Sequence, residues 1–289
     1  MPSSKKSDEP EKSSILREGS KILMQAGIMS AATDARVMLS HILDTDARIL
    51  NYDAKITPSA RKKFMDSINR RATGEPVAYI TGKKEFWRHM FKVGTETLVP
   101  RPDSETLVEA VLEKFSDREA AHNILDLGTG TGCLLLSLIS EYENARGTGI
   151  DLSAAAIKVA KSNARNLGLS DRAKFICKSW LDDTGPGGKF NMVISNPPYV
   201  KTADLDTLDT ARHEPKIALS GGADGLGCYR EIAAALKRWN ILAPGACLLF
   251  EIGKDQADAV EKILAETGFG LASSHKDLGG IIRVLEFLN

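Results

Sequence analysis

The chain has 289 residues, of which 43% are hydrophobic and 26% charged, as in an ordinary soluble globular protein. Lysine plus arginine and aspartate plus glutamate both number 38, so the formal net charge is zero. Proteins that coat nucleic acid carry a basic excess, so this balance predicts no stable nucleic-acid binding, although it leaves a local basic patch open.

Residues 1–14 are polar and lack the apolar stretch of a signal peptide, which predicts a disordered tail. The longest strongly apolar run, Cys133–Ile139, is too short to span a bilayer. We therefore expect a cytoplasmic protein without membrane contact. The cysteines have no CxxC pair and no histidine at metal-ligand spacing, which predicts buried free thiols and no metal site. They are Cys133, Cys177, Cys228 and Cys247.

Residues 15–73 follow the apolar period of helices throughout. Gly27 ends the first helix, Thr33 and Asp34 are candidate caps of the second, and Pro58 begins another that is rich in lysine and arginine. Because the apolar stripes can turn inward, the pattern predicts a small all-helical domain.

Residues 74–102 break this helical period. The apolar positions within 77–80 and 86–93 predict two short strands with a turn near Gly82–Lys84. We expect this β-hairpin to link the helical domain to a second domain, residues 103–289.

From Asn123 onward, short β-rich runs alternate with helical stretches, which is typical of βαβ units and a parallel sheet. Two runs near the C-terminus predict a closing antiparallel pair. The fold class is therefore α/β, with seven strands. The runs are NILDL (123–127), RGTGID (146–151), AKFIC (173–177), NMVIS (191–195), ACLLFE (246–251), GFGLAS (268–273) and IIRVLEFL (281–288).

A glycine-rich turn, residues 128–132, lies between the first of these strands and the next helix. Glycine lets the backbone approach a ligand closely. Asp151 ends the following strand, where a carboxylate can accept from both ribose hydroxyls. Cys133 stands where a dinucleotide fingerprint needs its later glycine, and the turn resembles that of S-adenosylmethionine (SAM)-dependent methyltransferases. Asp126, ahead of the turn, either binds the ammonium group or fixes the loop.

The fourth expected strand ends in Asn196-Pro197-Pro198-Tyr199, at the sheet edge where open α/β folds bind ligands. A planar NH2 group is a poor nucleophile because its lone pair is delocalised. The Asn196 side-chain carbonyl and the Pro197 backbone carbonyl can each accept one N–H bond and so orient the nitrogen. Tyr199 offers a flat face for the planar group. The motif predicts methylation of a planar amino or amide nitrogen.

Several other polar residues are expected to have mainly structural roles. Asp103 and Glu105 are expected to cap the helix that follows them. Glu251 ends a strand and can touch the site, but a catalytic role is the less favoured reading. His41 and His213 are interpreted as a core or rim histidine and a loop residue.

Six segments, in the same order, resemble the release factor glutamine methyltransferases, the HemK-type family. The resemblance begins near Gly74 and covers about three quarters of the chain. The first two segments distinguish this family from the adenine methyltransferases that act on DNA, because those enzymes share the Asn-Pro-Pro-Tyr motif. The segments are GEPVAYITGKKEFW (74–87), LVPRPDSETLVE (98–109), ILDLGTGTG (124–132), SNPPYV (195–200), EPKIALSGGADGL (214–226) and LLFEIG (248–253).

The resemblance implies a Rossmann-like SAM-dependent methyltransferase fold. It implies transfer of a methyl group from SAM to the side-chain N5 of the glutamine in the Gly-Gly-Gln loop of class 1 peptide chain release factors, leaving S-adenosylhomocysteine. The helical domain would grip the factor, and we expect a monomer. Asn196, Pro197 and Tyr199 carry over as catalytic residues and, with Pro198, as substrate contacts. The implied cofactor contacts are Gly128, Thr129, Gly130, Thr131, Gly132, Asp151, Trp180 and Asn196.

One residue departs from the family pattern. Ser179 stands before the aromatic Trp180, where the family commonly has aspartate, and a hydroxyl accepts from the adenine amino group more weakly than a carboxylate does. Trp180 itself can stack on the base or cover its edge, and its alternative reading is a rim aromatic without a ligand.

Two rival functions stay open at this point. A DNA or RNA amino-methyltransferase, acting on adenine N6 or guanine N2, would use the same pocket and is favoured by the Lys/Arg-rich residues 61–71. The zero net charge and the absence of a target-recognition insertion count against it. A non-catalytic SAM-binding protein of the translation machinery is disfavoured, because a binding module gains nothing from aligning a nucleophile.

Overall fold

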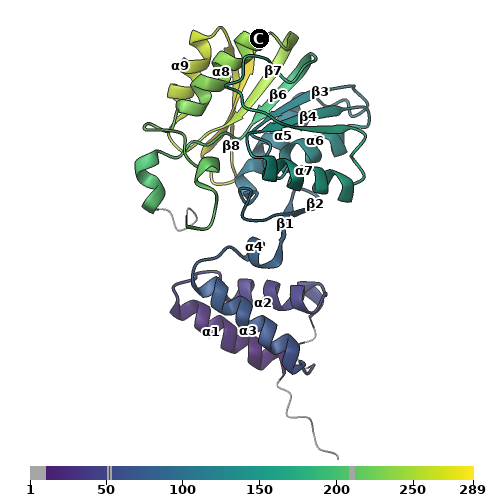
Figure 1. The fold of residues 1–289 in the computed structure, drawn as a ribbon, viewed down its shortest axis with the longest axis vertical. Helices are drawn as coiled ribbons and strands as arrows, with labels where there is room; N and C mark the ends of the chain where they lie inside the picture. The colour runs from purple at the N-terminus through teal and green to yellow at the C-terminus, as the bar shows by residue number, and fades with distance from the viewer. Residues whose placement is uncertain (1–10, 51, 53, 208–211) are drawn as a thin grey trace, which may run out of the picture. The chain divides into compact units, whose positions relative to one another are not determined.

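The structure, a computed structural model, describes residues 11–50, 52, 54–207 and 212–289. It divides into two compact units, residues 1–82 and 83–289, which are described separately (Figure 1). Most of the expected tail, residues 1–10, lies outside the described residues. Its last part is corrected, because the first helix already begins at Lys12.

The first unit is helical, as predicted. Its core is formed by residues such as Leu23, Leu39 and Phe64, each fully buried. Thr57 caps α3 by accepting from the backbone N–H of Ala60 at 3.3 Å. The elements are α1 (Lys12–Gln25), α2 (Ala31–Ile42), η1 (Ala47–Ile49), α3 (Pro58–Ala72) and α4 (Val77–Thr81).

The predicted caps of α2 are wrong. The helix begins at Ala31, so Thr33 and Asp34 lie inside its first turn. The Asp34 carboxylate accepts instead from the hydroxyl of Ser30 at 2.9 Å and from Arg71 Nε at 2.7 Å. It therefore ties the start of α2 to the end of α3.

The hairpin has two strands, as predicted, but its first strand begins later than predicted, and so its turn also lies later. Residues 77–81 form α4 because Val77 and Ile80, spaced by three residues, both pack on the helical core. Gly82 ends α4 with a positive φ of 70°. The two strands are β1 (Lys83–Phe86) and β2 (His89–Lys92), which pair antiparallel across Trp87 and Arg88. The expected linker is thus divided between the two units.

The second unit contains a seven-stranded sheet in the order β5-β4-β3-β6-β7-β9-β8, so the α/β prediction is confirmed. The first five strands in that order are parallel, and β9 and β8 close the sheet antiparallel, as expected. The elements are η2 (Pro102–Ser104), α5 (Glu105–Lys114), β3 (Asn123–Leu127), α6 (Cys133–Glu141), β4 (Arg146–Asp151), α7 (Ala154–Asn166), β5 (Ala173–Cys177), β6 (Phe190–Ser195), η3 (Thr202–Thr207), η5 (Lys216–Ala218), α8 (Gly227–Trp239), β7 (Leu242–Glu251), α9 (Ala257–Glu266), β8 (Gly270–Lys276) and β9 (Ile282–Leu288).

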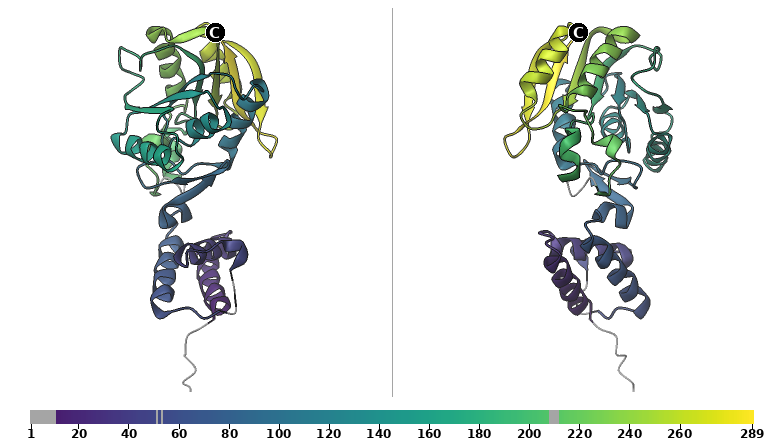
Figure 2. Two further views of the ribbon diagram at one scale, coloured as in Figure 1. Left: turned by 90° about the vertical axis from the view of Figure 1, so that its right-hand side faces the viewer. Right: turned by 60° about the vertical axis from the view of Figure 1, so that its left-hand side comes forward.

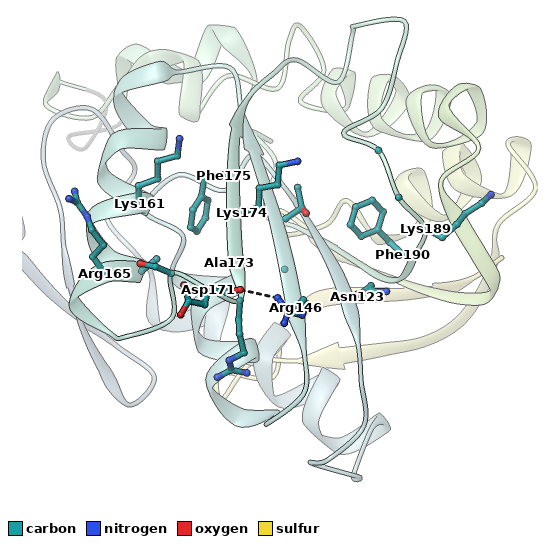
Figure 3. Close-up of a pocket in the computed structure, with 17 residues that line it drawn as sticks. Asn123, Arg146, Lys161, Arg165, Asp171, Ala173, Lys174, Phe175, Lys189 and Phe190 are labelled. Atoms are coloured by element: carbon teal, nitrogen blue, oxygen red, sulfur yellow. Dashed lines mark hydrogen bonds between the residues drawn. The ribbon is translucent and has the colours of Figure 1, made fainter.

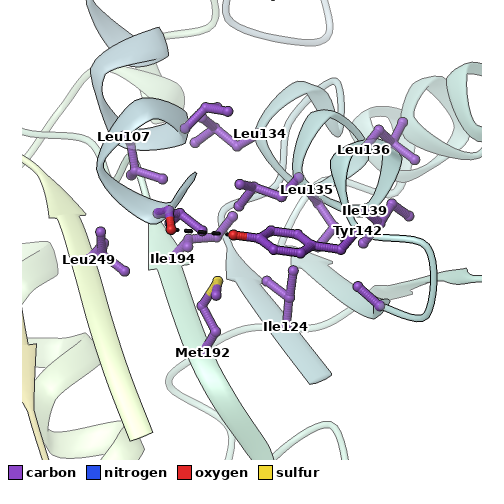
Figure 4. Close-up of a cluster of buried hydrophobic side chains, with 14 of the residues drawn as sticks. Leu107, Ile124, Leu134, Leu135, Leu136, Ile139, Tyr142, Met192, Ile194 and Leu249 are labelled. Carbon is purple, nitrogen blue, oxygen red and sulfur yellow. Dashed lines mark hydrogen bonds between the residues drawn. The ribbon is translucent and has the colours of Figure 1, made fainter. Parts of the chain in front are cut away.

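Helices cover both faces of this sheet, as the two further views show (Figure 2). Alternate strand residues point to opposite faces, so Ile124 packs under α5 and α6, while Leu125 packs under α8. Figure 4 shows Tyr142 among the buried side chains of the first of these cores, and its hydroxyl donates to the Phe115 carbonyl at 2.7 Å. The strands at the centre of the sheet are therefore packed on both faces, which positions the loops at their carboxyl ends.

Two smaller predictions need correction. Neither Asp103 nor Glu105 caps α5: Asp103 pairs with Arg283 at 3.0 Å, and Glu105 accepts from the Trp87 backbone N–H at 2.7 Å. The four cysteines are free thiols, but only Cys228 and Cys247 are buried, whereas Cys133 is half-buried and Cys177 is exposed. Within the described residues, no helix has the length and apolar character that crossing a membrane requires.

Candidate functional site

The carboxyl ends of β3, β4 and β6 meet at one edge of the sheet, and a cleft of about 700 Å³ opens there within the second unit. Most predicted site residues line it, whereas Gly132, Pro197 and Tyr199 are not among the described lining residues. The predicted residues that line the cleft are Gly128, Thr129, Gly130, Thr131, Asp151, Trp180, Asn196 and Pro198.

The glycine turn is bound to the neighbouring strand. The N–H groups of Gly128 and Thr129 donate to the Ile150 carbonyl at 3.0 and 2.9 Å. One Asp151 carboxylate oxygen accepts from the Gly130 N–H at 2.9 Å, and the other accepts from the Ser153 N–H at 2.8 Å. Burial raises the pKa of Asp151, although these two N–H bonds oppose the rise. Asp151, which is predicted to accept from the ribose hydroxyls, therefore also holds the glycine turn in place.

Gly132 serves packing rather than the cleft. Its φ is 79°, and a Cβ added there would lie 3.2 Å from Leu136 and 3.3 Å from Ala160 and Phe175. This glycine therefore lets α6 pack closely against α7 and β5.

Asp126 fixes the loop. It is 1% exposed, does not line the cleft, and accepts from the Thr129 hydroxyl at 2.5 Å. Burial raises its pKa to about 7, and its other oxygen has no partner among the described residues. Of the two roles left open by the sequence, the geometry favours fixing the turn.

Trp180 lies beside the glycine turn and also lines the cleft. A Cβ added at Gly128 would lie 3.5 Å from its ring, an ordinary contact distance, so the ring packs beside this residue, and the φ of 77° is what favours glycine there. Its indole N–H donates to Glu231 at 2.8 Å, which fixes the ring orientation. The hydroxyl of Ser179 accepts from the Leu181 N–H at 3.0 Å, so it already stabilises a turn at the position where the family commonly has aspartate.

Asn196 is oriented by a hydrogen bond. Its Nδ2 donates to the Ser104 hydroxyl at 3.1 Å. The side-chain oxygen Oδ1 then faces away from Ser104, and no donor among the described residues contacts it. A carbonyl acceptor at the cleft is what the motif predicts for a planar nitrogen.

Glu251 lies behind Asn196, at the end of β7. It is 1% exposed, and burial raises its pKa to about 7. Hydrogen bonds from Ser104 and Asn196 favour its charged form, as does Arg283 nearby. The sequence indicates Glu251 only as a less favoured candidate, and it carries no signal that singles out Ser104.

The remaining motif residues support this corner. Pro197 is buried, and no described donor contacts its carbonyl oxygen. Tyr199 is half-buried, and a Cβ added at Gly253 would lie 3.1 Å from its ring, so the ring packs closely on this glycine. Burial raises the pKa of the Tyr199 hydroxyl to about 12, so it stays protonated at neutral pH.

A buried ion pair, also missed, joins two of the family-like segments. Glu214 is 4% exposed and accepts from the Val99 N–H at 3.1 Å and from Arg101 at 2.5 Å. Burial raises the pKa of Glu214, and the Arg101 charge opposes this rise. The pair holds Arg101 and the neighbouring Pro215, which both line the cleft.

The cleft fits a molecule with a hydroxyl-bearing part and a flat apolar part. Its glycine turn presents backbone, Asp151 presents a carboxylate, and Trp180 presents a ring. Leu152 and Leu181 also line it and are 59% and 62% exposed, so they offer apolar surface to a bound base. These features match SAM. No group of three histidine, cysteine, aspartate or glutamate side chains suited to a metal ion occurs among the described residues.

Comparisons with known proteins bear on the family and the fold. A family model described as the PrmC N-terminal domain matches residues 14–82, and one described as the methyltransferase small domain matches residues 102–213. The fold resembles a solved methyltransferase from Pyrococcus furiosus, with a TM-score of 0.52 and 15% identity, over 68% of this chain and 87% of that one.

Two curated relatives are similar over nearly their whole length. A release factor glutamine methyltransferase from Rhodospirillum rubrum is 42% identical, over 94% of this chain and 83% of the relative. One from Caulobacter vibrioides is 39% identical over 91% of each chain. The chain therefore belongs to the release factor glutamine methyltransferase family.

Proposed function

We propose that this protein methylates the side-chain amide nitrogen N5 of the glutamine in the Gly-Gly-Gln loop of class 1 peptide chain release factors. SAM is the methyl donor and S-adenosylhomocysteine the product. We further propose that it works in the cytoplasm as a monomer and uses no metal. The observation that carries the proposal is the pair of unpartnered carbonyl acceptors, Asn196 Oδ1 and the Pro197 carbonyl, at the Asn-Pro-Pro-Tyr corner.

These acceptors suit an amide NH2 group. Each takes one N–H bond of the substrate, so the nitrogen is held in a single orientation. Ser104 fixes the Asn196 amide, and the two prolines fix the backbone, so little reorganisation accompanies the reaction. The pyramidalising nitrogen then presents its lone pair. Its proton becomes acidic only as the N–C bond forms, so no base is needed beforehand.

We propose that Gly128, Gly130, Asp151 and Trp180 hold the donor, and that Tyr199 supports the planar amide. SAM supplies an electrophilic methyl group on a sulfonium. The Asp151 carboxylate retains acceptor capacity for ribose hydroxyls, because each of its oxygens accepts only one backbone N–H. Gly132 and Pro197 contribute through packing and backbone rather than through side chains in the cleft.

The deciding experiment offers labelled SAM with a release factor, with the same factor carrying Gln→Ala in its Gly-Gly-Gln loop, and with duplex DNA. We expect label in the unmodified factor alone. Label in DNA but not in the factor would favour the amino-methyltransferase reading. SAM binding without transfer to any of the three would favour the non-catalytic reading.

The helical unit is proposed to bind the release factor. Its surface has a groove of about 670 Å³ that combines the cations Arg17, Lys21 and Arg36 with apolar Met24, which is 62% exposed. Such a mixture of arginine and methionine is typical of protein-binding surfaces.

Reversing charge in this groove is expected to weaken substrate binding alone. The double variant Arg17→Glu/Arg36→Glu should raise KM for the release factor about tenfold and leave kcat unchanged. The matched control is Lys62→Glu/Lys63→Glu, which changes exposed residues on α3 outside the groove. Equal KM values for the two double variants would contradict the docking role.

A further inference from the structure

A second cleft, of about 980 Å³, lies at the opposite edge of the sheet, where the parallel strands begin (Figure 3). Asn123, Arg146, Ala173 and Phe190, the first residues of β3, β4, β5 and β6, all line it. It shares no lining residue with the methyl-transfer cleft, and the proposed function does not use it.

This cleft is strongly basic although the chain is neutral. Six of its lining residues are cationic and one, Asp171, is acidic. None of the six has an ion-pair partner among the described residues. The cations are Arg146, Lys161, Arg165, Arg172, Lys174 and Lys189.

Some of these cations are held by neutral groups, and others are free to reach a ligand. Arg172 donates to the Tyr142, Glu143 and Ala145 carbonyls, which keeps its charge at the cleft. Lys161 and Arg165 on α7 and Lys174 on β5 are exposed and make no hydrogen bond or ion pair with the described residues. Their side chains are drawn in Figure 3.

The lining is unlike a protein-binding surface. Its two aromatic residues, Phe175 and Phe190, are each only 5% exposed. Interfaces between proteins are depleted in lysine and enriched in accessible aromatics, and single-stranded nucleic acid needs rings on which bases stack. A wide cleft with several separated cations and no stacking surface suits the paired backbone of a double helix.

We propose that this cleft binds the backbone of double-helical RNA. The cations contact phosphates, and neutral or acidic groups among them can meet the ribose. Asp171 repels phosphate but accepts well from a 2′-hydroxyl, and Thr148 and Ser170 can bond the same group. DNA lacks that hydroxyl. The prediction of no stable nucleic-acid binding rests on the net charge of the whole chain, which is zero. The cleft is a local basic region within that neutral chain.

The test measures binding of a labelled RNA duplex, a DNA duplex of the same sequence and polyglutamate by the full-length protein. If about four phosphates are contacted, RNA affinity should fall on the order of 100-fold between 50 and 200 mM salt. The triple variant Lys161→Gln/Arg165→Gln/Lys174→Gln should bind RNA at least tenfold more weakly. Its dependence of log K on log salt should be shallower by about 2.7.

A matched variant separates this site from net charge. Lys237→Gln/Lys254→Gln/Lys262→Gln removes the same charge from exposed residues of the second unit that lie outside the cleft, and it should bind RNA like the unmodified protein. Equal losses in the two triple variants, or no binding of RNA at 50 mM salt, would overturn the proposal. DNA binding as tight as RNA binding would overturn the choice of RNA. Preference for polyglutamate would point to an acidic protein instead.

Discussion

Replacing Asn196 by alanine is expected to lower kcat for methyl transfer about 100- to 1,000-fold, while SAM still binds measurably. The variant removes one of the two acceptors that orient the substrate nitrogen, and loss of one preoriented polar group of this kind typically costs about 3–4 kcal/mol of transition-state stabilisation. Single-turnover rates with saturating release factor measure the loss, and calorimetric titration measures SAM affinity.

The substitution Asn196→Asp is the informative companion. Aspartate keeps an acceptor oxygen at the cleft but loses the Nδ2 donor to Ser104. We expect its kcat to lie at least tenfold above that of the alanine variant. An alanine variant within tenfold of the unmodified rate would show that Asn196 does not orient the nucleophile.

The α/β unit could be predicted from the sequence because its signals are local. Each strand is a short β-rich run, and burial on both faces demands continuous apolar residues such as those of NMVIS. The hairpin was mispredicted where two signals compete. Val77 and Ile80 fit a strand by composition, but the helical core offers them a shared face, so the segment folds as α4.

The residues of the site also fall into two groups, those that local sequence signals predict and those that only the fold brings together. The glycine turn, Asp151 and Asn196 end consecutive strands, so topology alone brings them to one edge. Ser104 and Glu251 could not be found so easily, since they are 92 and 55 residues from Asn196. Glu251 comes close to it through the pairing of β7 with β6, and Ser104 through the packing of α5 on the sheet. A motif shows which atoms face a ligand, whereas the groups that hold those atoms are fixed by the fold.

Glu251 is expected to have a large effect on how the unfolding free energy depends on pH. Its carboxyl group is buried, and burying a charged group costs more free energy than burying a neutral one. Burial raises its pKa from 4.5 to about 7. Between these values the folded state binds a proton that the unfolded state releases, so Glu251 makes the unfolding free energy fall as pH rises from 4.5 to 7. Above pH 7 both states are ionised and the loss is complete. It amounts to about 3 kcal/mol.

The substitution Glu251→Gln should remove this fall of the unfolding free energy with rising pH. Glutamine has the same shape, still accepts from Ser104, and stays neutral at every pH. The unfolding free energy of the variant, relative to the unmodified protein, should therefore rise by about 3 kcal/mol between pH 4.5 and 8. Asp126 and Arg283 are present in both proteins, so their own titrations largely cancel in the difference.

The measurement is the melting temperature of both proteins across this pH range. The difference between the variant and the unmodified protein should widen by about 6–12 °C as pH rises from 4.5 to 8. The control is Glu261→Gln, which removes the same charge from an exposed residue on α9, and an equal widening for this variant would show that the effect does not come from the burial of Glu251. Parallel curves for Glu251→Gln would mean that the buried carboxylate is ionised throughout, stabilised by Ser104, Asn196 and Arg283. In that case Glu251 would hold Asn196 through charge-assisted hydrogen bonds, and the glutamine variant should lose turnover at every pH.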